Sequence, residues 1–143
     1  MSKKTVLVAV SGGFDPVHIG HVRMFREAKR LGTKLVVIIN NDNWLRKKKG
    51  FVFMPQAERG EIIKALRDVD YVVFTEHQAD CTDMSVCKEL GELRPDVFAN
   101  GGDRLATNIP EYQLCESLNI HMVFGVGGKK VQSSSDLVKE MKK

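Results

Sequence analysis

Five short apolar runs, each rich in β-branched or aromatic residues, alternate along this chain with stretches of helical periodicity, and this alternation limits its fold more than any other feature. The runs span Val6–Val10, Leu35–Ile39, Tyr71–Phe74, Val97–Ala99 and Ile120–Val126. Continuous apolar runs are typical of strands covered on both faces, and helices between successive strands make those strands parallel, with right-handed crossovers. The sequence therefore predicts an α/β fold with a doubly wound, five-stranded parallel sheet of Rossmann-like form, in a single domain over residues 1–143.

Helical patterns fill most of the intervals between these strands. They run from the turn after Val10 to about Leu31, from Pro55 to about Arg67, from Met84 to Leu93, from Pro110 to about Leu118 and from Ser135 to Met141. Pro55 and Pro110 open two of them, and Gly32 and Pro95 follow the ends of two, as is typical of helix boundaries. The interval after the second strand is predicted as a basic loop.

The composition is that of an ordinary globular enzyme. Apolar residues make up 43% and charged residues 28% of the 143 residues. No apolar stretch is long enough to span a bilayer, and the first residues lack the apolar region of an export signal. Cys81, Cys87 and Cys115 form no C-x-x-C pair, which favours reduced thiols over a disulfide framework or a zinc site. These features predict a cytoplasmic protein without a membrane partner.

The net charge of +4 is concentrated in one basic run, Arg46–Lys49. A nucleic-acid groove needs a longer basic surface with interleaved aromatic residues, whereas only Trp44 and Phe51 flank this run. The charge pattern predicts recognition of a small polyanion and no nucleic-acid partner. A solvated loop is the alternative interpretation.

The turn after the first strand carries the main signal for a binding site. Gly12 and Gly13 precede the first helix, whose unpaired N–H groups and dipole favour a phosphate. His18 and His21 are three residues apart, so both rings lie on one helix face, with Gly20 leaving space between them. The alternative is that the histidines, and Asp15, only cap the helix.

A parallel sheet of this kind binds ligands at the carboxyl ends of its strands. Ser11–Gly13, Asn40–Asp42, Asn100–Arg104 and Gly125–Ser135 follow four of the predicted strands, and all are rich in glycine or polar residues. We expect these segments to converge on one site.

The segment Gly12–His21 resembles the G-x-F-D-x-x-H-x-G-H signature of the HIGH-motif nucleotidylyltransferases. Phe14, Asp15, His18, Gly20 and His21 match its defined positions in register. The resemblance extends over nearly the whole chain and is strongest to heptose-phosphate adenylyltransferases and glycerol-3-phosphate cytidylyltransferases. It implies the nucleotidylyltransferase form of the Rossmann-like fold.

Other segments resemble the same family. Asp42, Arg46 and Lys49 look like the family's segment after the second strand, where a lysine reaches phosphate, and Arg59 looks like part of its E-x-R-style helix. Asn100–Asp103 looks like the nucleotide loop of the heptose enzymes. The final motif departs from the pattern: three serines, Ser133, Ser134 and Ser135, replace an Ile-Ser-Thr-Thr string, and the preceding arginine is absent. Either Lys129 or Lys130 would supply that charge, without arginine's bidentate fork.

The resemblance implies transfer of a nucleoside monophosphate from a nucleoside triphosphate to a phosphorylated sugar or polyol, with release of pyrophosphate. It assigns catalysis to His18, His21 and Lys49. Nucleotide binding is assigned to Gly12, Gly13, Phe14, Asp15, Gly20, Gly101, Asp103, Ser133, Ser134 and Ser135. Substrate binding is assigned to Asp42, Arg46, Arg59 and Lys129. Mg²⁺ is the expected cofactor, held mostly by phosphate and water and not by an all-protein site.

Several alternatives stay open at this stage. ATP is favoured over CTP by the match at Gly101–Asp103, and the acceptor is undetermined, with FMN as one option. A non-enzymatic nucleotide sensor would have no need of paired histidine donors, and a class I aminoacyl-tRNA synthetase fragment would carry a K-M-S-K-S loop, which this sequence lacks. The oligomeric state is open, with a homodimer as one option.

Overall fold

The computed structural model describes residues 4–101 and 109–127 of the chain. Five strands form one sheet in the order β3-β2-β1-β4-β5, and every neighbouring pair is parallel. The strands are β1 (Leu7–Gly12), β2 (Lys34–Ile39), β3 (Tyr71–Phe74), β4 (Val97–Gly101) and β5 (His121–Val126). The predicted α/β fold, with its doubly wound parallel sheet, is confirmed.

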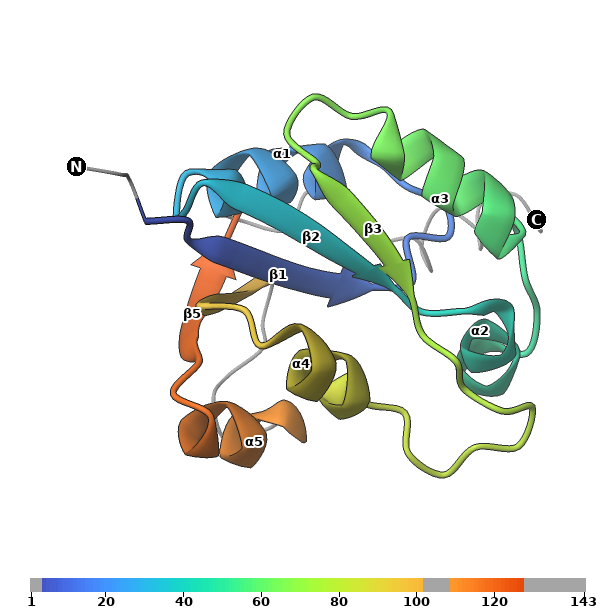
Figure 1. Ribbon diagram of the computed structural model, residues 1–143. Helices are drawn as coiled ribbons and strands as arrows, with labels where there is room; N and C mark the ends of the chain where they lie inside the picture. The colour runs from blue at the N-terminus through green and yellow to red at the C-terminus, as the bar shows by residue number, and fades with distance from the viewer. Residues whose placement is uncertain (1–3, 102–108, 128–143) are drawn as a thin grey trace.

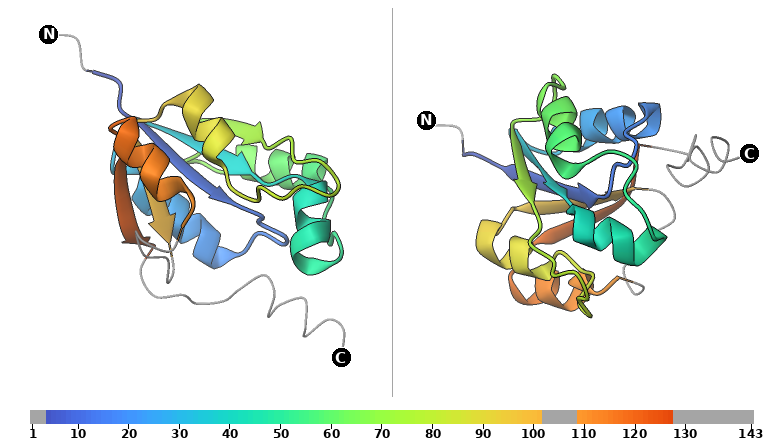
Figure 2. Two further views of the ribbon diagram at one scale, coloured as in Figure 1. Left: turned by 90° about the horizontal axis from the view of Figure 1, so that it is seen from below. Right: turned by 90° about the vertical axis from the view of Figure 1, so that its right-hand side faces the viewer.

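Helices cover both faces of the sheet (Figure 1). α1 (Ile19–Lys29) and α3 (Gln56–Lys64) lie on one face, and α4 (Cys87–Leu93) and α5 (Glu111–Ser117) lie on the other. α2 (Asp42–Lys49) lies beyond the carboxyl ends of β1, β2 and β3 (Figure 2). The order of the strands reverses between β1 and β4, which is the point where open α/β sheets bind ligands.

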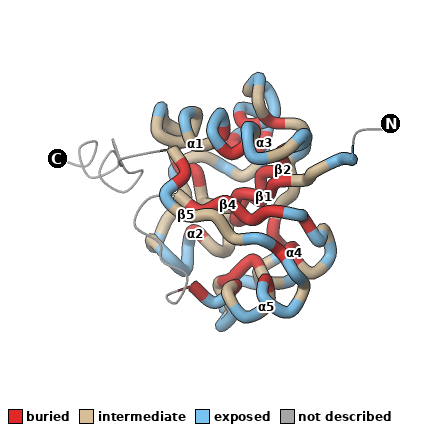
Figure 3. The backbone as a smooth tube through the Cα atoms, turned by 90° about the vertical axis from the view of Figure 1, so that its left-hand side faces the viewer, coloured by how far each residue is buried: buried red, intermediate tan, exposed pale blue. Residues whose placement is uncertain are grey.

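Side-chain alternation along the central strands divides the core into two layers. Val8 and Val10 of β1 face the α1/α3 side, whereas Ala9 faces the α4/α5 side. The same alternation holds in β2 and β4, where residues on both faces are buried. Figure 3 shows the buried backbone concentrated in these central strands. This two-sided burial explains why their sequences read as continuous apolar runs.

The basic segment after β2 is a helix, so its prediction as a loop was wrong. The side chain of Asn41 accepts a hydrogen bond from the N–H of Trp44 (3.0 Å) and caps the start of α2. Gly50, at φ +89°, closes the other end, with its N–H donating to the carbonyl of Arg46 (2.8 Å). Leu45 is fully buried and anchors the helix to the domain. The Asn and Gly caps were the sequence signals that could have revealed it.

Other helix ends differ from expectation by a few residues. α1 begins at Ile19 and ends at Lys29, α3 ends at Lys64, and α4 begins at Cys87 instead of Met84. The predicted helix from Ser135 to Met141 lies outside the described residues.

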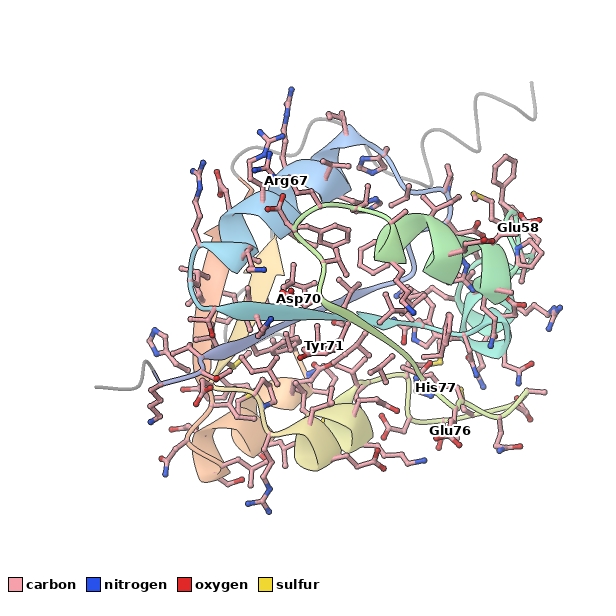
Figure 4. All side chains as sticks on the ribbon, turned by 45° about the horizontal axis from the view of Figure 1, so that its top comes forward. Glu58, Arg67, Asp70, Tyr71, Glu76 and His77 are labelled. Atoms are coloured by element: carbon pink, nitrogen blue, oxygen red, sulfur yellow. The ribbon has the colours of Figure 1, made fainter. Side chains whose placement is uncertain are left out.

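Aspartates fasten the amino ends of the strands, opposite the ligand edge. Asp70, just before β3 (Figure 4), accepts a hydrogen bond from the N–H of Leu35 (2.8 Å) and pairs with Nζ of Lys29 (2.6 Å). Asp96, just before β4, accepts one from the N–H of Leu7 (2.8 Å). Each carboxylate thus fixes the start of one strand to the neighbouring strand. Both contacts lie at the end of the sheet opposite the carboxyl edge.

Within the described residues, Cys81, Cys87 and Cys115 are all free thiols. Burial raises the pKa of Cys115 to about 11 and also raises that of Cys87, so both stay protonated at neutral pH. None of the described helices is long and apolar enough to cross a membrane.

Two helical glycines provide a test of the packing. A Cβ on Gly60 of α3 would clash with the ring of Phe74, whereas a Cβ on Gly91 of α4 would meet nothing within 4 Å. We expect Gly60→Ala to destabilise the fold by about 1–2 kcal/mol, because overpacking outweighs the gain in helix propensity. Gly91→Ala should instead stabilise it by about 0.5–1 kcal/mol. Urea denaturation of the two variants measures both, and a stabilising Gly60→Ala would contradict this packing.

Candidate functional site

The candidate site lies at the carboxyl edge of the sheet, where the turn after β1, the start of α1 and the end of α2 meet. His18, His21 and Lys49, the three residues predicted to be catalytic, come together there. His18 and Lys49 both lower the pKa of His21, so all three lie within electrostatic reach of one another. The sequence separates Lys49 from the histidines, and the packing of α2 beside the first turn unites them.

The two histidines cap α1 reciprocally. Nδ1 of His18 accepts a hydrogen bond from the N–H of Gly20, and Nδ1 of His21 accepts one from the N–H of His18, both at 3.1 Å. The rings stack with their centroids 3.8 Å apart and their planes 27° apart. The capping interpretation therefore describes the structure correctly. It also fixes the tautomer, because an Nδ1 that accepts leaves the proton of the neutral imidazole on Nε2.

The sequence predicts that Gly20 leaves open space for a ligand between the histidines. In the structure that space is used by the capping arrangement. A Cβ at this position would lie 2.9 Å from Cε1 of His18. The absence of a side chain therefore lets the His18 ring lie over the first turn of α1.

His21 is an uncharged group in this site. Burial, the neighbouring His18 and the ammonium of Lys49 lower its pKa from 6.5 to about 3. The edge-to-face contact with Phe14, at 4.9 Å and 84° between the rings, holds the imidazole in place. At neutral pH His21 is a hydrogen-bond donor through Nε2 and not a general acid.

Phe14, a predicted nucleotide contact, is a core residue in the structure. Its side chain is 4% exposed and packs edge-on against Phe25. A Cβ on Gly12 would lie 2.8 Å from the Phe14 ring, so Gly12 makes room for it. The backbone of Phe14 has φ of +53°, a left-handed conformation that turns the chain back toward α1.

Gly13 allows α2 to approach the turn. A Cβ at this position would lie 3.0 Å from Leu45 and 3.2 Å from the indole of Trp44. Trp44 is itself fixed because its Nε1 donates to the carbonyl of Met84 (2.8 Å). Neither Trp44 nor Leu45 was assigned a role from the sequence, and only the missed helix α2 could have revealed one.

Asp15 also faces the protein in this structure. Its side chain is 1% exposed, and its two oxygens accept hydrogen bonds from the N–H groups of Phe53 (2.7 Å) and Met54 (2.6 Å). These contacts fasten the segment between α2 and α3 over the first turn. The placement does not support the predicted contact between Asp15 and a nucleotide, because its carboxylate is already occupied.

Arg59, predicted to bind substrate, is fully buried in the protein. Its guanidinium donates to the carbonyls of Gly13 (2.7 Å), Asn40 (2.6 Å) and Met54 (2.9 Å) and to the carboxylate of Asp42 (2.7 Å). Arg59 therefore joins the ends of β1 and β2 to the start of α3. In this structure Arg59 supports the site, and its predicted contact with substrate stays a prediction.

Asp42 has a similar supporting role. Besides the Arg59 guanidinium, its Oδ1 accepts the N–H of Gln56 (2.9 Å), while the Gln56 side chain accepts the N–H of Asp42 (3.0 Å). This reciprocal pair joins the first residue of α2 to the first residue of α3. Its predicted contact with substrate is likewise not supported by this placement.

Lys49 and Arg46 are the site's cations. Lys49 is half-buried in the last turn of α2, and burial, with help from Arg59 and Lys48, lowers its pKa although Asp15 opposes the shift. Arg46 lies one turn earlier and is exposed. Both are held on a helix and not on a mobile loop.

Gly101 ends β4 beside α1, where a Cβ would lie 2.9 Å from Sδ of Met24. The remaining predicted site residues lie outside the described residues: Asp103, Lys129, Lys130, Ser133, Ser134 and Ser135. Their roles stay predictions, as do the backbone contacts of Gly12 and Gly13 with a nucleotide.

Comparison with known proteins assigns the family. A family model described as "Cytidylyltransferase-like" matches residues 9–139 of the 143. The chain belongs to the cytidylyltransferase-like family. This confirms the resemblance identified from the first turn.

Proteins similar to this chain come from bacteria and archaea. The bifunctional protein HldE of Streptomyces coelicolor is 42% identical over 108 residues, which are 73% of this chain but 22% of HldE. The FAD synthase of Thermococcus sibiricus is 39% identical over 106 residues, 73% of this chain and 68% of the synthase. A solved structure, the lipopolysaccharide core biosynthesis protein of Thermoplasma volcanium, has a TM-score of 0.68 at 26% identity, over 85% of this chain and 96% of that one. The chain thus spans about a fifth of HldE and about two thirds of the synthase.

The lowered pKa of His21 predicts a pH dependence of stability. Because its pKa is about 3 when folded and 6.5 when exposed, unfolding takes up a proton between these values. The free energy of unfolding should therefore fall as the pH drops through this window, by up to ~1.4 kcal/mol per pH unit, and the contribution should be complete above pH ~6.5.

His21→Gln isolates this effect, because glutamine accepts the same capping hydrogen bond without titrating. Urea denaturation from about pH 6 to about pH 4 should give the variant a shallower decline than the wild type. His121→Gln, at an exposed position of β5, is the matched control and should follow the wild type. Parallel curves for wild type and His21→Gln would mean that His21 is protonated in the folded protein.

Proposed function

We propose that this protein transfers a nucleoside monophosphate from a nucleoside triphosphate to a phosphorylated acceptor and releases pyrophosphate. The observation that carries the proposal is the pair of stacked imidazoles at the start of α1, in which each Nδ1 accepts a capping hydrogen bond and each Nε2 is left to donate. Lys49 supplies a positive charge next to them. Membership of the cytidylyltransferase-like family supports the same reaction class.

The chemistry needs no covalent intermediate with the protein. An oxygen of the acceptor's phosphate forms a bond to the α-phosphorus, and the bond from that phosphorus to the bridging oxygen breaks, so pyrophosphate leaves with the electron pair. The protein's task is to align two polyanions and to stabilise the charge that develops on the α-phosphoryl oxygens. The Nε2–H groups of His18 and His21 can stabilise that developing charge, because each donates a hydrogen bond to the oxygens without giving up its proton.

Lysine and arginine side chains are suited to aligning the two polyanionic substrates. Lys49 and Arg46 lie in the last turns of α2, and the N-terminus of the eleven-residue helix α1 adds its dipole. Arg59 and Asp15 lie behind these groups and fix the turn, the α2–α3 segment and the strand ends relative to one another. A preorganised site of this kind pays little reorganisation free energy during reaction.

Mg²⁺ enters this proposal as part of the nucleotide substrate. Among the described residues no three histidine, cysteine or carboxylate side chains gather closely enough to hold a metal ion. Asp15 does not fit a protein-held Mg²⁺, because both of its oxygens accept backbone N–H groups, and Oδ1 of Asp42 already accepts from Gln56 and Arg59.

For the acceptor, we propose a phosphorylated sugar or polyol with ATP as the nucleotide, with CTP as the competing donor. The resemblance to heptose-phosphate adenylyltransferases and the 42% identity to HldE support this choice. FMN is the second candidate, because the protein of Thermococcus sibiricus that shares 39% identity is a FAD synthase.

Pyrophosphate release with the four nucleoside triphosphates, each paired with sugar phosphates, glycerol 3-phosphate or FMN, tests the proposal. We expect turnover with ATP and one acceptor class. His18→Ser separates helix capping from catalysis, because serine caps the helix as well as histidine does but has no imidazole Nε2–H. Its kcat should fall by roughly 100-fold at nearly unchanged melting temperature. No pyrophosphate release with any pair would favour a nucleotide sensor.

Lys49→Gln tests the cation. We expect this variant to raise the KM for the nucleoside triphosphate and to lower kcat, together by about tenfold or more in kcat/KM, because one desolvated charge near the phosphates is lost. Lys48→Gln is the matched control on the exposed side of the same helix and should change kcat/KM by less than about twofold. A larger effect of Lys48→Gln than of Lys49→Gln would overturn the assignment.

A further inference from the structure

Two asparagine side chains at the carboxyl edge carry oxygens that find no hydrogen-bond partner among the described residues. Asn40 follows β2 and is 4% exposed, and Asn100 lies in β4 and is 3% exposed. Oδ1 of each is buried and accepts no hydrogen bond from residues 4–101 or 109–127. Nδ2 of Asn100 donates to the carbonyl of Phe98 (3.3 Å), which fixes the orientation of its amide group.

The register of the sheet places both asparagines on one face. Ile38 and Phe98 face the α4/α5 side, so by alternation Asn40 and Asn100 face it too. Continuing the pairing of Gly12 with Ile39 puts Asn40 level with Gly13. β1 lies between β2 and β4, so its carboxyl end separates the two asparagines, and with strands about 4.8 Å apart β2 and β4 lie roughly 10 Å from each other. We call Asn40 and Asn100 the amide row.

The amide row and the cationic residues flank the same turn from opposite sides. His21 and Phe14 pack with the α1/α3 layer, and Lys49 lies within reach of His21. Gly12 and Gly13 lie between this cationic side and the amide row, and both are half-buried. Further polar atoms without a partner lie on the α4/α5 side, at Oε1 of Glu89 and at Nε2 of His77, which follows β3 (Figure 4).

Unpartnered buried oxygens are costly to keep. Leaving a buried acceptor without a hydrogen bond costs about 1–3 kcal/mol, and an apolar side chain of the same shape would avoid this cost. Two such oxygens at the strand ends therefore point to a ligand that supplies the missing donors. A fully ionised phosphate has only acceptor oxygens, so the missing donors belong to another part of the ligand, such as a hydroxyl group.

We propose that the amide row binds hydroxyl groups of the acceptor and thereby selects a polyhydroxylated phosphate, with the phosphate itself on the cationic side of the turn. This inference rests on the proposed function and names the acceptor subsite within it. The acceptor spans the Gly12–Gly13 turn, because its charged and uncharged parts are bound on opposite sides of that turn.

Asn40→Leu and Asn100→Leu test the proposal, because leucine has the branching of asparagine without its polar atoms. We expect the KM for a sugar or polyol phosphate to rise at least tenfold in each, with the KM for the nucleoside triphosphate within twofold of wild type. The melting temperature should be unchanged or higher, because an unpartnered oxygen is removed. Asn100→Ala serves where the leucine variant does not fold.

Asn41→Leu is the matched control, since the Asn41 side chain already accepts from Trp44 and donates to the carbonyl of His77 (3.0 Å). It should lower the melting temperature, and the acceptor KM should change by less than threefold. A second control uses a hydroxyl-free alkyl phosphate as the acceptor, whose KM should be the same in wild type and in the asparagine variants.

An unchanged acceptor KM in both leucine variants, or an increase in the nucleotide KM instead, would overturn the amide row as the acceptor subsite. Calorimetric titration of the acceptor into the protein gives a readout that does not depend on turnover. If the wild type binds the acceptor and the leucine variants do not, the result supports the amide row even if no pyrophosphate is released. If both variants turn over the acceptor as the wild type does, the amide row is refuted and the proposed function is unaffected.

Discussion

The buried guanidinium of Arg59 holds the carboxyl edge of this domain together. It donates hydrogen bonds to the backbone of the β1 turn, the end of β2 and the segment before α3, and it pairs with Asp42 at the start of α2. Backbone carbonyls at strand ends and in loops lack partners in the sheet, and a planar group with several donors satisfies three such carbonyls at once. Removing one partner of a buried charged network typically costs about 3–5 kcal/mol, so the geometry of the site depends on this residue.

The histidine pair shows how one side chain serves both structure and chemistry. Each imidazole has two nitrogens, and here Nδ1 of each accepts a backbone N–H in the first turn of α1. That use decides where the proton of the neutral ring lies, and burial keeps His21 neutral. Capping and donation are therefore not competing interpretations, because they use different atoms of the same ring.

The turn after β1 separates two kinds of recognition. Helix N-terminus, lysine and imidazoles on the α1 side suit phosphate, whereas the neutral carboxamides on the α4/α5 side suit hydroxyl groups. The topology produces this division, because β1 lies at the point where the strand order reverses and its turn borders both layers of helices. A phosphorylated polyhydroxyl compound has the matching distribution of charge.

The sequence by itself determined the architecture and the place of the site. Continuous apolar runs identified strands buried on both faces, and the Gly12–His21 segment identified the family, because both signals are local in the chain. It did not reveal that Asp15, Asp42 and Arg59 hold the backbone of the site, since a motif position does not show whether a charged side chain points toward a ligand or toward unpaired backbone groups. It also missed α2, whose short basic sequence looks like a loop until Leu45 has a core to enter. Only the tertiary structure decided what these side chains contact. The partners of Arg59, the environment of His21 and the unpartnered oxygens of Asn40 and Asn100 depend on segments that are distant in sequence. These segments become adjacent only after the sheet has formed.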